Sequence, residues 1–384
     1  MQTKLDQKFS LTHKGNKAEN ILRSCVHCGF CLATCPTYQL TGNELDSPRG
    51  RIYLIKSILE QNQVSQKSLQ HLDNCLTCRS CETTCPSGVE FSELVDIGRE
   101  LVEHKRPVWQ KVMRHSVRKL LTTPPLFNII APLFRQSIIE SDVIETNTRN
   151  GRVLLLTGCV QPTLSPNTNH VTKNVLAKLG YAVTETPQQQ CCGAINQHTS
   201  AQDAALVQVK QNIDEWEKLL ASGIKTIIST ASGCGVMVKD YPKLFETNDS
   251  YYQKAITVAT QTKDIAEFLL EQDLSTLSPQ KTKISYHAPC SLQHGQKLPN
   301  LVESLLEKLG YDLSPVVDKH LCCGSAGTYS IFQSQTAKQL RTNKLANLNE
   351  SQPELIVTSN VGCQMHLAKG TPTPVKHWIE LLDN

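Results

Sequence analysis

The sequence predicts an α+β multidomain protein, in which an N-terminal α-helical domain is followed by two duplicated α/β domains. Two observations support this prediction. A run of four cysteines occurs twice at one spacing near the N-terminus, with helix-forming sequence around both copies. Further along, a pattern of about 130 residues repeats, and in it short β-branched runs alternate with helical segments, as in mainly parallel sheets. We expect a helical domain over 1–106, a basic helical linker over 107–150, and α/β domains over 151–276 and 277–384.

The composition narrows the class of protein. The 384 residues suffice for two or three domains, and a net charge of +4 is too small to indicate a nucleic-acid partner. The first residues, MQTKLDQKFSLTHKGNK, are polar, and no stretch approaches the ~18 apolar residues of a spanning helix. These features predict a cytoplasmic protein without a secretory signal. In that compartment, 16 cysteines favour metal binding over disulfides.

Both N-terminal cysteine runs follow the spacing C-x2-C-x2-C-x3-C-P: CVHCGFCLATCP (25–36) and CLTCRSCETTCP (75–86). This is the pattern of bacterial 4Fe–4S ferredoxins, in which the fourth cysteine binds the other cluster. Zinc is the alternative, but zinc sites draw on two CxxC pairs, whereas each run offers three close cysteines and one distant. His27 is expected to be a spacer or a hydrogen-bond donor beside the ligands. We therefore predict two 4Fe–4S clusters with crossed ligands: Cys25, Cys28, Cys31 and Cys85 for one, and Cys75, Cys78, Cys81 and Cys35 for the other.

The sequence around the two runs is helical rather than β-rich. Between them, PRGRIYLIKSILEQ places Ile52, Ile55, Ile58 and Leu59 on one helical face, bounded by Pro48 and a polar QNQ segment. After the second run, SELVDIGRELVEHK has Leu94, Ile97 and Leu101 on one side. The N-terminal part is therefore expected to be a helical ferredoxin domain.

The other eight cysteines belong to the repeat. Three cysteines recur with a shift of 131 residues and a fourth with a shift of 129, and LAKLGYAV (176–183) matches LEKLGYDL (306–313). The two sets are Cys159, Cys191, Cys192 and Cys234, and Cys290, Cys322, Cys323 and Cys363. Each set contains a Cys-Cys-Gly sequence, which core packing does not require, although buried cysteines often serve as small apolar residues.

Apolar runs precede these cysteines and predict the strands of two parallel sheets. The runs are RVLLLT, YAVTET and KTIIS in the first copy, and KISYH, YDLSPVV and ELIVTS in the second. Sites in such sheets gather beyond the carboxyl ends of the strands, so each copy should bring four thiols together. An all-thiolate set suits an iron–sulfur cluster or zinc, and we favour iron–sulfur.

The order of these motifs resembles the iron–sulfur subunits of glycolate oxidase. Their wider group includes subunits of anaerobic glycerol-3-phosphate dehydrogenase, lactate-utilisation proteins and heterodisulfide reductases, all with CCG domains. The stretches that carry the resemblance are CVHCGFCLATCPTYQLTGNELDSPRGRIYLI, GCVQPTLSPNTN, TASGCG, LCCGSAGTY and HWIELL. The resemblance covers nearly the whole chain.

The resemblance implies an electron-transfer subunit of an oxidoreductase complex, with no catalytic residue of its own. Flavin-binding partner subunits would oxidise glycolate to glyoxylate, and the clusters would pass electrons to an acceptor such as membrane quinone. The chain shows no GxGxxG after a strand and no Walker pattern, which agrees with a flavin held elsewhere.

Two alternatives stay open, and a third, a non-enzymatic iron or redox sensor, would need a DNA- or effector-binding element that the sequence does not show. One is the equivalent subunit of a lactate or glycerol-3-phosphate dehydrogenase. The other is a thiol-catalytic subunit like those of heterodisulfide reductases, in which each CCG domain ends in CxxC and holds five cysteines. Here Ala231 and Asn360 stand at the first position of that CxxC, which argues against this chemistry.

The linker carries a basic amphipathic segment. Between His104 and Ile139 there are seven Lys or Arg and no Asp or Glu. Trp109, Met113, Val117 and Leu120 lie on one expected helical face, and Lys111, Arg114 and Arg118 lie opposite. Such a helix could lie on the anionic inner face of the cytoplasmic membrane, making the protein peripheral. The interpretation that we favour is a connecting helix packed on its own protein or on a partner.

Overall fold

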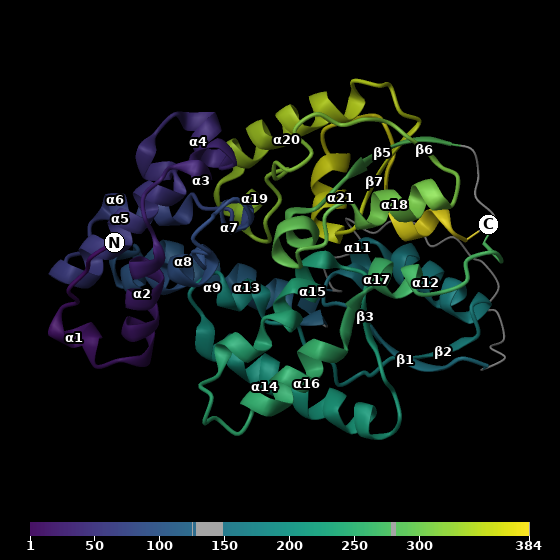
Figure 1. Cartoon of the computed structure of the whole chain (residues 1–384), viewed down its shortest axis with the longest axis horizontal. Coiled ribbons are helices and arrows are strands. Elements are labelled where there is room, and N and C mark those ends of the chain that lie inside the picture. The colour runs from purple at the N-terminus through teal and green to yellow at the C-terminus, as the bar shows by residue number, and fades with distance from the viewer. Residues whose placement is uncertain (125, 128–148, 278–281, 384) are drawn as a thin grey trace.

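The computed structural model describes residues 1–124, 126–127, 149–277 and 282–383. The N-terminal helices, purple to blue in Figure 1, lie to one side of two α/β domains that pack against each other. The predicted fold class is confirmed in these residues. The predicted domain boundaries stay predictions.

The N-terminal domain is built from short helices around one apolar core. They are α1 (Gln7–Ser10), α2 (His13–Ser24), α3 (Phe30–Ala33), α4 (Pro36–Thr41), α5 (Pro48–Gln61), α6 (Gln66–Asp73), α7 (Ser80–Thr83) and α8 (Phe91–Val102). The Ser47 hydroxyl caps α5 by accepting from the Gly50 N–H, and Asn62 in the left-handed conformation ends it.

The two predicted amphipathic helices meet in this core. All four residues of the expected face of α5 are buried, and Leu94 of α8 packs against them. A Cβ at Gly98 would lie only 2.6 Å from Cγ1 of Ile55, so glycine allows α8 to approach α5 closely.

The first α/β domain has a parallel sheet in the order β2-β1-β3-β4. Its strands are β1 (Gly151–Leu156), β2 (Tyr181–Thr184), β3 (Ile227–Ser229) and β4 (Thr262–Asp264). Its helices are α11 (Gln161–Leu164), α12 (Pro166–Lys178), α13 (Ala194–Gln197), α14 (Gln202–Ala221), α15 (Ser232–Lys239), α16 (Tyr252–Gln261) and α17 (Ile265–Leu270).

The second α/β domain repeats this topology in the order β6-β5-β7-β8. Its strands are β5 (Lys283–His287), β6 (Asp312–Leu313), β7 (Leu355–Thr358) and β8 (Val375–His377). Its helices are α18 (Leu301–Lys308), α19 (Tyr329–Phe332), α20 (Ser334–Asn349) and α21 (Val361–Ala368), with a π-helical turn over Ser291–Gly295 and a 3₁₀ turn over Trp378–Leu381.

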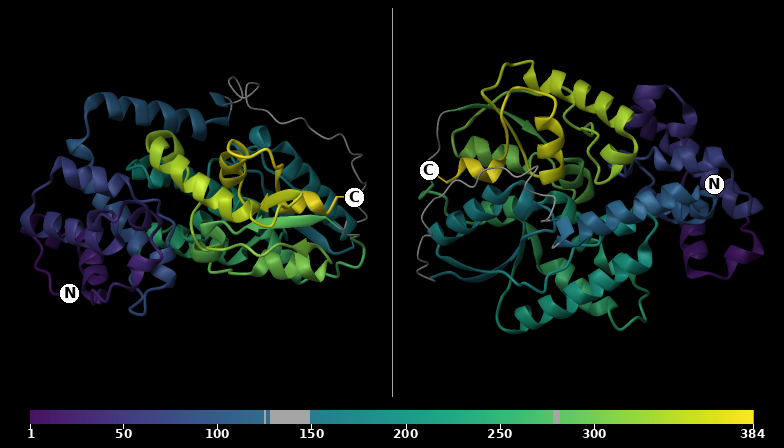
Figure 2. Two further views of the ribbon diagram at one scale, coloured as in Figure 1. Left: turned by 90° about the horizontal axis from the view of Figure 1, so that it is seen from above. Right: turned by 180° about the vertical axis from the view of Figure 1, so that it is seen from behind.

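Successive side chains of β1 point to opposite faces of the sheet and belong to two different apolar cores. Val153 and Leu155 of β1 face a core shared with Ile284 and Tyr286 of β5, which joins the two domains through α12, α17 and α18. Leu154 faces the opposite side, in a separate core with α14 and α16. The two sheets therefore form one unit, as the views in Figure 2 show.

Helix α9 (Val108–Thr122) leaves the N-terminal domain and runs along the outside of the molecule, as the long blue helix in the left view of Figure 2. Its orientation is the reverse of the usual amphipathic arrangement. Arg114 is buried, with an ion pair of 3.0 Å to Asp73, whereas Val108 and Trp109 are 76% and 65% exposed. Residues 125 and 128–148, which include most of the proline-containing segment that follows and Arg135, lie outside the described residues. Within the described ranges, no helix is both long and apolar enough to cross a bilayer.

Candidate metal centres

The two N-terminal cysteine runs fold into matching turns. His27 and Gly29 of the first run have φ of 56° and 85°, and Thr77 and Arg79 occupy the same places in the second run with 53° and 61°. The left-handed region is costly for a β-branched residue such as Thr77. The turn directs the Thr77 N–H toward Sγ of Cys75, 3.4 Å away, as in backbone concavities that bind iron–sulfur sulfur atoms.

The structure brings the cysteines of the two runs together in two cavities. One is lined by Cys25, Cys28, Cys31 and Cys85, and also by Cys81. The other is lined by Cys35, Cys75, Cys78 and Cys81. In each cavity, three cysteines of one run thus meet the fourth cysteine of the other.

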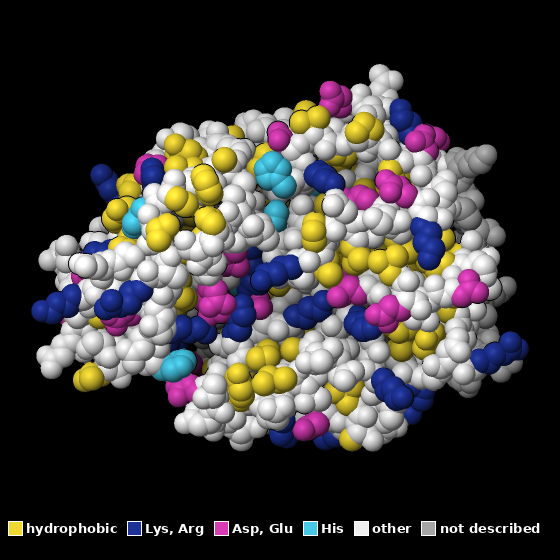
Figure 3. Space-filling view, viewed as in Figure 1, with side chains coloured by type: hydrophobic (Ala, Val, Ile, Leu, Met, Phe, Trp, Pro, Cys, Tyr) yellow, Lys and Arg dark blue, Asp and Glu magenta, His cyan; other side chains and the backbone are white. Residues whose placement is uncertain are grey.

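The first cavity lies near the surface. Cys28 is exposed, and Val26, Phe30 and Tyr53 beside it are 66%, 60% and 52% exposed. Figure 3 shows apolar side chains gathered over this part of the molecule, around α3 and α4. The ring of His27 stacks on that of Tyr53 at 4.5 Å, so this histidine forms part of the wall of the turn.

The second cavity is enclosed by polar side chains that sequence analysis missed. Arg51 is 1% exposed and lines the cavity. It donates to Oγ1 of Thr37 at 3.2 Å and to the carboxylate of Asp46 at 3.3 Å, and Thr37 lies 3.3 Å from Sγ of Cys35. His71 also contacts that carboxylate, at 2.9 Å. Arg51 therefore places its guanidinium, paired with Asp46, beside the thiols of this cavity.

Burial controls the protonation of the free thiols. It raises the pKa of Cys81 well above its usual range, and burial together with the Cys290 thiol does the same for Cys78. Thiolates rather than thiols bind metal, so loading this cavity would release protons.

The first α/β domain brings its four predicted thiols together. Cys159 follows β1, Cys191 and Cys192 follow β2, and Cys234 lies in the first turn of α15. The pKa of Cys192 lies well below its usual range because of hydrogen bonds with Cys191, which has the larger effect, and with Cys234. A hydrogen bond with Cys159 raises the pKa of Cys191. The four sulfur atoms thus form one continuous cluster.

The second α/β domain does the same. Sγ of Cys290 lies 3.8 Å from Sγ of Cys322, and Cys323 interacts with both Cys322 and Cys363. Gly324 has φ of 90°, and a Cβ there would lie 2.7 Å from the Ala337 carbonyl oxygen of α20, so the Cys-Cys pair must be followed by glycine.

This second cluster contains a histidine that sequence analysis missed. One ring nitrogen of His287 and the sulfur atoms of Cys323 and Cys363 all lie within 4.8 Å of one another. The only signal in the sequence is a polar residue at the end of the apolar run KISYH, three positions before Cys290.

The positions of the missing fifth cysteines are now visible. Asn360 precedes α21 and donates from Nδ2 to Sγ of Cys363 at 3.5 Å, and Ala231 precedes α15 without a polar group. The Asn360 amide therefore contacts the thiols of the second α/β domain at the position where heterodisulfide reductase subunits are expected to have a thiolate.

The second cysteine run lies against the second α/β domain. Cys78 and Cys290 pack beside a buried group that includes Leu76, Cys322 and Tyr329. The Tyr329 hydroxyl donates to the Asn74 carbonyl at 3.3 Å, and Thr83 contacts Nδ1 of His294 at 2.9 Å. The two thiol sites are thus neighbours across a domain boundary.

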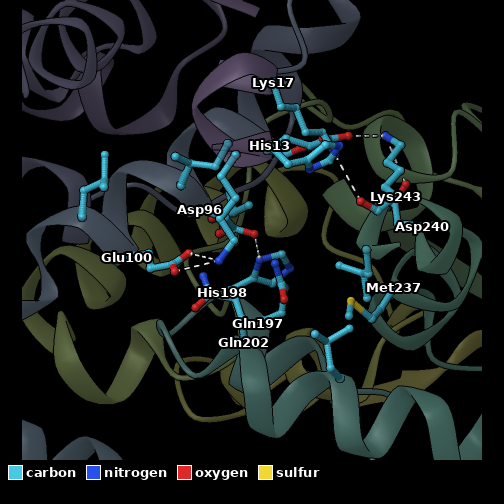
Figure 4. Close-up of a pocket in the computed structure, with 18 of the residues that line it drawn as sticks. His13, Lys17, Asp96, Glu100, Gln197, His198, Gln202, Met237, Asp240 and Lys243 are labelled. Atoms are coloured by element: carbon cyan, nitrogen blue, oxygen red, sulfur yellow. Dashed lines mark hydrogen bonds and ion pairs between the residues drawn. The ribbon is translucent and has the colours of Figure 1, made fainter. Parts of the chain in front are cut away.

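A cavity of about 580 Å³ opens between the N-terminal domain and the first α/β domain (Figure 4), and Cys78 and Cys290 line it. Polar groups on its walls contact one another: His198 of the first α/β domain lies 2.9 Å from Asp96 across the gap, and Lys14 pairs with Glu100 within the N-terminal domain at 2.7 Å. Figure 3 shows Lys, Arg, Asp and Glu side chains intermixed on the face of the molecule between the N-terminal domain and the α/β domains.

Soft thiolate ligands and cavities at the thiols fit iron–sulfur clusters. A family model described as a 4Fe–4S dicluster domain matches residues 21–89, and a model described as a cysteine-rich domain matches 153–239 and 284–368. The prediction of two 4Fe–4S clusters is thereby confirmed. The metal content of the two CCG domains stays a prediction.

Curated relatives match along the chain. The glycolate oxidase iron–sulfur subunit of Escherichia coli is 45% identical, over 100% of this chain and 98% of the relative. The probable glycolate oxidase iron–sulfur subunit of Bacillus subtilis is 27% identical over 92% and 89%. Lactate utilization protein A of Bacillus licheniformis is 25% identical over 61% of this chain and 99% of its own. With both domain types matched and 45% identity to a full-length relative, the chain belongs to the family of glycolate oxidase iron–sulfur subunits.

Proposed function

We propose that this chain conducts electrons within a glycolate oxidase complex. Flavin-binding partner subunits oxidise glycolate to glyoxylate, and this subunit passes the electrons one at a time to an acceptor such as membrane quinone. The observation that supports the proposal best is the contact between the second cysteine run and the second α/β domain, where Cys78 lies beside Cys290. It makes the thiols of the second run and those of the second α/β domain neighbours rather than isolated sites.

The proposed ligands follow the two N-terminal cavities. Cys25, Cys28, Cys31 and Cys85 would hold the first cluster, and Cys75, Cys78, Cys81 and Cys35 the second. The cavity linings support this crossed assignment. When bound, the clusters supply one-electron redox chemistry, and the chain itself orients them and sets the charge around them.

Electrons are proposed to enter at the first cluster. Cys28 is its exposed ligand, and Val26, Phe30 and Tyr53 surround it with apolar surface. Exposed apolar patches of this kind are typical of protein–protein contacts. The occupant that we propose is the flavin-binding subunit, because an electron donor must come close to a cluster edge and this cluster has a ligand open to solvent.

The second cluster is placed to relay electrons inward. Its cysteines are more buried, Arg51 lies beside it, and Arg99 links it to the first α/β domain. Arg99 donates to the Cys75 carbonyl at 2.5 Å and to the His198 carbonyl at 3.4 Å. A rigid bridge keeps the distances between centres constant, which a relay requires.

The first prediction tests whether substrate oxidation belongs to the flavin-binding subunits and electron transfer to this chain. The chain, purified anaerobically with its clusters, should not reduce an artificial acceptor with glycolate, and it should do so once the flavin-binding subunits are added. Phe30→Ser should lower this partner-dependent rate about tenfold while the iron content stays unchanged. Val317→Ser, at a 56% exposed site of the second α/β domain, is the matched control.

Two results would contradict the proposal. Turnover of glycolate by the chain alone would place the active site in this subunit. Turnover of lactate, but not glycolate, by the assembled complex would favour the alternative that the lactate-utilisation relative suggests. Thiol-catalytic disulfide reduction is less well supported, because Ala231 and Asn360 replace the fifth cysteines.

We further propose a cytoplasmic location. Contact with the membrane through the basic face of α9 is not favoured, because Arg114 pairs with Asp73 and Arg118 donates to the Thr199 carbonyl at 2.8 Å. The exposed side of this helix carries Val108, Trp109, Val112 and Met113, together with His115, Ser116 and Lys119.

A further inference from the structure

We propose that His287 is a metal ligand of the second α/β domain, which gives that domain a mixed site of one imidazole and four thiolates. The first α/β domain has thiolates alone. This inference goes beyond the proposed function and does not depend on which substrate the complex oxidises.

The geometry supports a shared metal ion. A ring nitrogen of His287 and the sulfur atoms of Cys323 and Cys363 lie within 4.8 Å of one another. A metal ion about 2.0–2.3 Å from each ligand atom would lie between them after small side-chain movements. His287 ends β5, Cys323 follows β6 and Cys363 follows β7, so three strand ends deliver the three groups to one point.

The hydrogen-bonding state of His287 points to an absent partner. Its side chain is 1% exposed, and neither ring nitrogen has a hydrogen-bond partner among the described residues. A buried polar group that is left without a partner destabilises the folded state. His377, which is also buried, accepts from the Ile379 N–H at 3.2 Å and contacts the Thr230 carbonyl at 2.8 Å. This fold therefore does satisfy a buried histidine whose role is structural.

The first domain shows that the fold does not need a histidine here. His287 pairs with Thr358 in the sheet, and its counterpart Leu156 pairs with Ser229. Leu156 is 5% exposed and packs in the apolar core with α14. An apolar residue thus suffices at this position, and the second domain keeps a polar one at an energetic cost.

His287 also brings the number of possible metal-binding groups in the second α/β domain to five. With Cys290, Cys322, Cys323 and Cys363 it makes five, the number that the missing cysteine at Asn360 would have given. A neutral imidazole in place of a thiolate makes the site less negative, and the nearby buried Lys344 acts in the same direction. The second site should therefore accept electrons more readily than the first, as imidazole ligation raises the potential of other iron–sulfur centres.

The experiment is metal analysis and pulsed EPR on the full-length chain that carries Cys234→Ser. This substitution removes a proposed ligand of the first α/β domain, so that the remaining EPR signals come from the second α/β domain and the two N-terminal clusters. With ¹⁵N-labelled histidine, the signal of the second domain should show coupling to a histidine nitrogen. His287→Leu should abolish this coupling and lower metal retention in that domain about tenfold or more. His287→Cys should restore the metal without the nitrogen coupling.

His377→Leu is the control for loss of a buried histidine, and it should keep the coupling even if it lowers stability. Absence of histidine coupling in the parent chain would overturn the proposal, as would unchanged metal and spectra in His287→Leu. If His287→Leu does not fold, the coupling in the parent chain decides alone.

Discussion

At the scale of single residues, Asp264 shows how burial and capping compete. Its Oδ1 accepts from the Ala266 N–H at 3.0 Å and caps α17, while Glu267 accepts from the Asp264 N–H at 2.7 Å. The side chain is fully buried, and Oδ2 has no hydrogen-bond partner among the described residues. Burial raises the pKa of Asp264 to about 7.

This pKa predicts a pH-dependent stability. Between about pH 4 and 7 the folded chain keeps a proton that the unfolded chain has lost, so stability falls as pH rises, by up to about 1.4 kcal/mol per pH unit from this group. Asp264→Asn keeps a capping oxygen without a charge. Its melting temperature should therefore change less between pH 5 and 8 and exceed that of the parent at pH 8. Calorimetry of the anaerobic protein measures this, with exposed Asp273→Asn as the control that should follow the parent. Parallel curves for Asp264→Asn and the parent would contradict the prediction.

Residues differ in how far the sequence reveals them. The eight N-terminal cysteines could be singled out because ferredoxin-type ligation imposes a fixed spacing along the chain, and the other eight because they recur with the repeat; their role as ligands stays a prediction. His287 and Arg51 were not, because each acts through contacts made only after strands and helices pack. A histidine in an apolar run and an arginine in an amphipathic helix have no distinctive local pattern.

At the scale of elements, the amphipathic helices and the longer strands were predictable from periodicity. The short edge strands β4 and β8 were not, since three residues with a charged centre, such as Val375–His377, carry no strand pattern. Strand β6 is shorter than the run YDLSPVV suggested, because only Asp312 and Leu313 pair with β5. Pro315, two residues further on, has no N–H to offer a sheet.

The orientation of α9 was also beyond reach of periodicity. The pattern separates its apolar and basic faces correctly but does not say which face packs inward. Asp73 and the ring of Phe332 attract Arg114, whose guanidinium lies 5.0 Å from the ring centre. Burying that pair turns Val108 and Trp109 outward.

The two cysteine runs yield a prediction at this scale. If each fourth cysteine binds the cluster of the other run, Cys35→Ser should alter the same cluster as Cys78→Ser. Cys85→Ser should likewise alter the same cluster as Cys28→Ser. The reason is that Cys35 lines the cavity of the second run and Cys85 that of the first. EPR and Mössbauer spectra of the four anaerobic variants make the comparison. Spectra that pair Cys35→Ser with Cys28→Ser would show that each run binds its own cluster.

At the scale of the whole molecule, the N-terminal domain is fastened to both α/β domains. Arg79 forms an ion pair with Asp240 of the first, and Thr83 contacts His294 of the second. These contacts flank the second cysteine run, so the cluster at this run is held in place by contacts to both α/β domains. A relay gains from this because electron transfer depends steeply on the distance between centres.

The order of the relay can be tested through magnetic coupling between reduced centres, which falls with the cube of their distance. Cys78 lies beside Cys290 and Cys322, whereas Cys192 packs within the core of the first α/β domain. Cys363→Ser, which removes a proposed ligand of the second α/β domain, should therefore narrow the EPR signal of the cluster at Cys78. Cys234→Ser, the equivalent change in the first domain, should leave that signal much as it was. Narrowing in Cys234→Ser alone would reverse the order of the relay, and no change in either variant would mean that the α/β domains lie outside it.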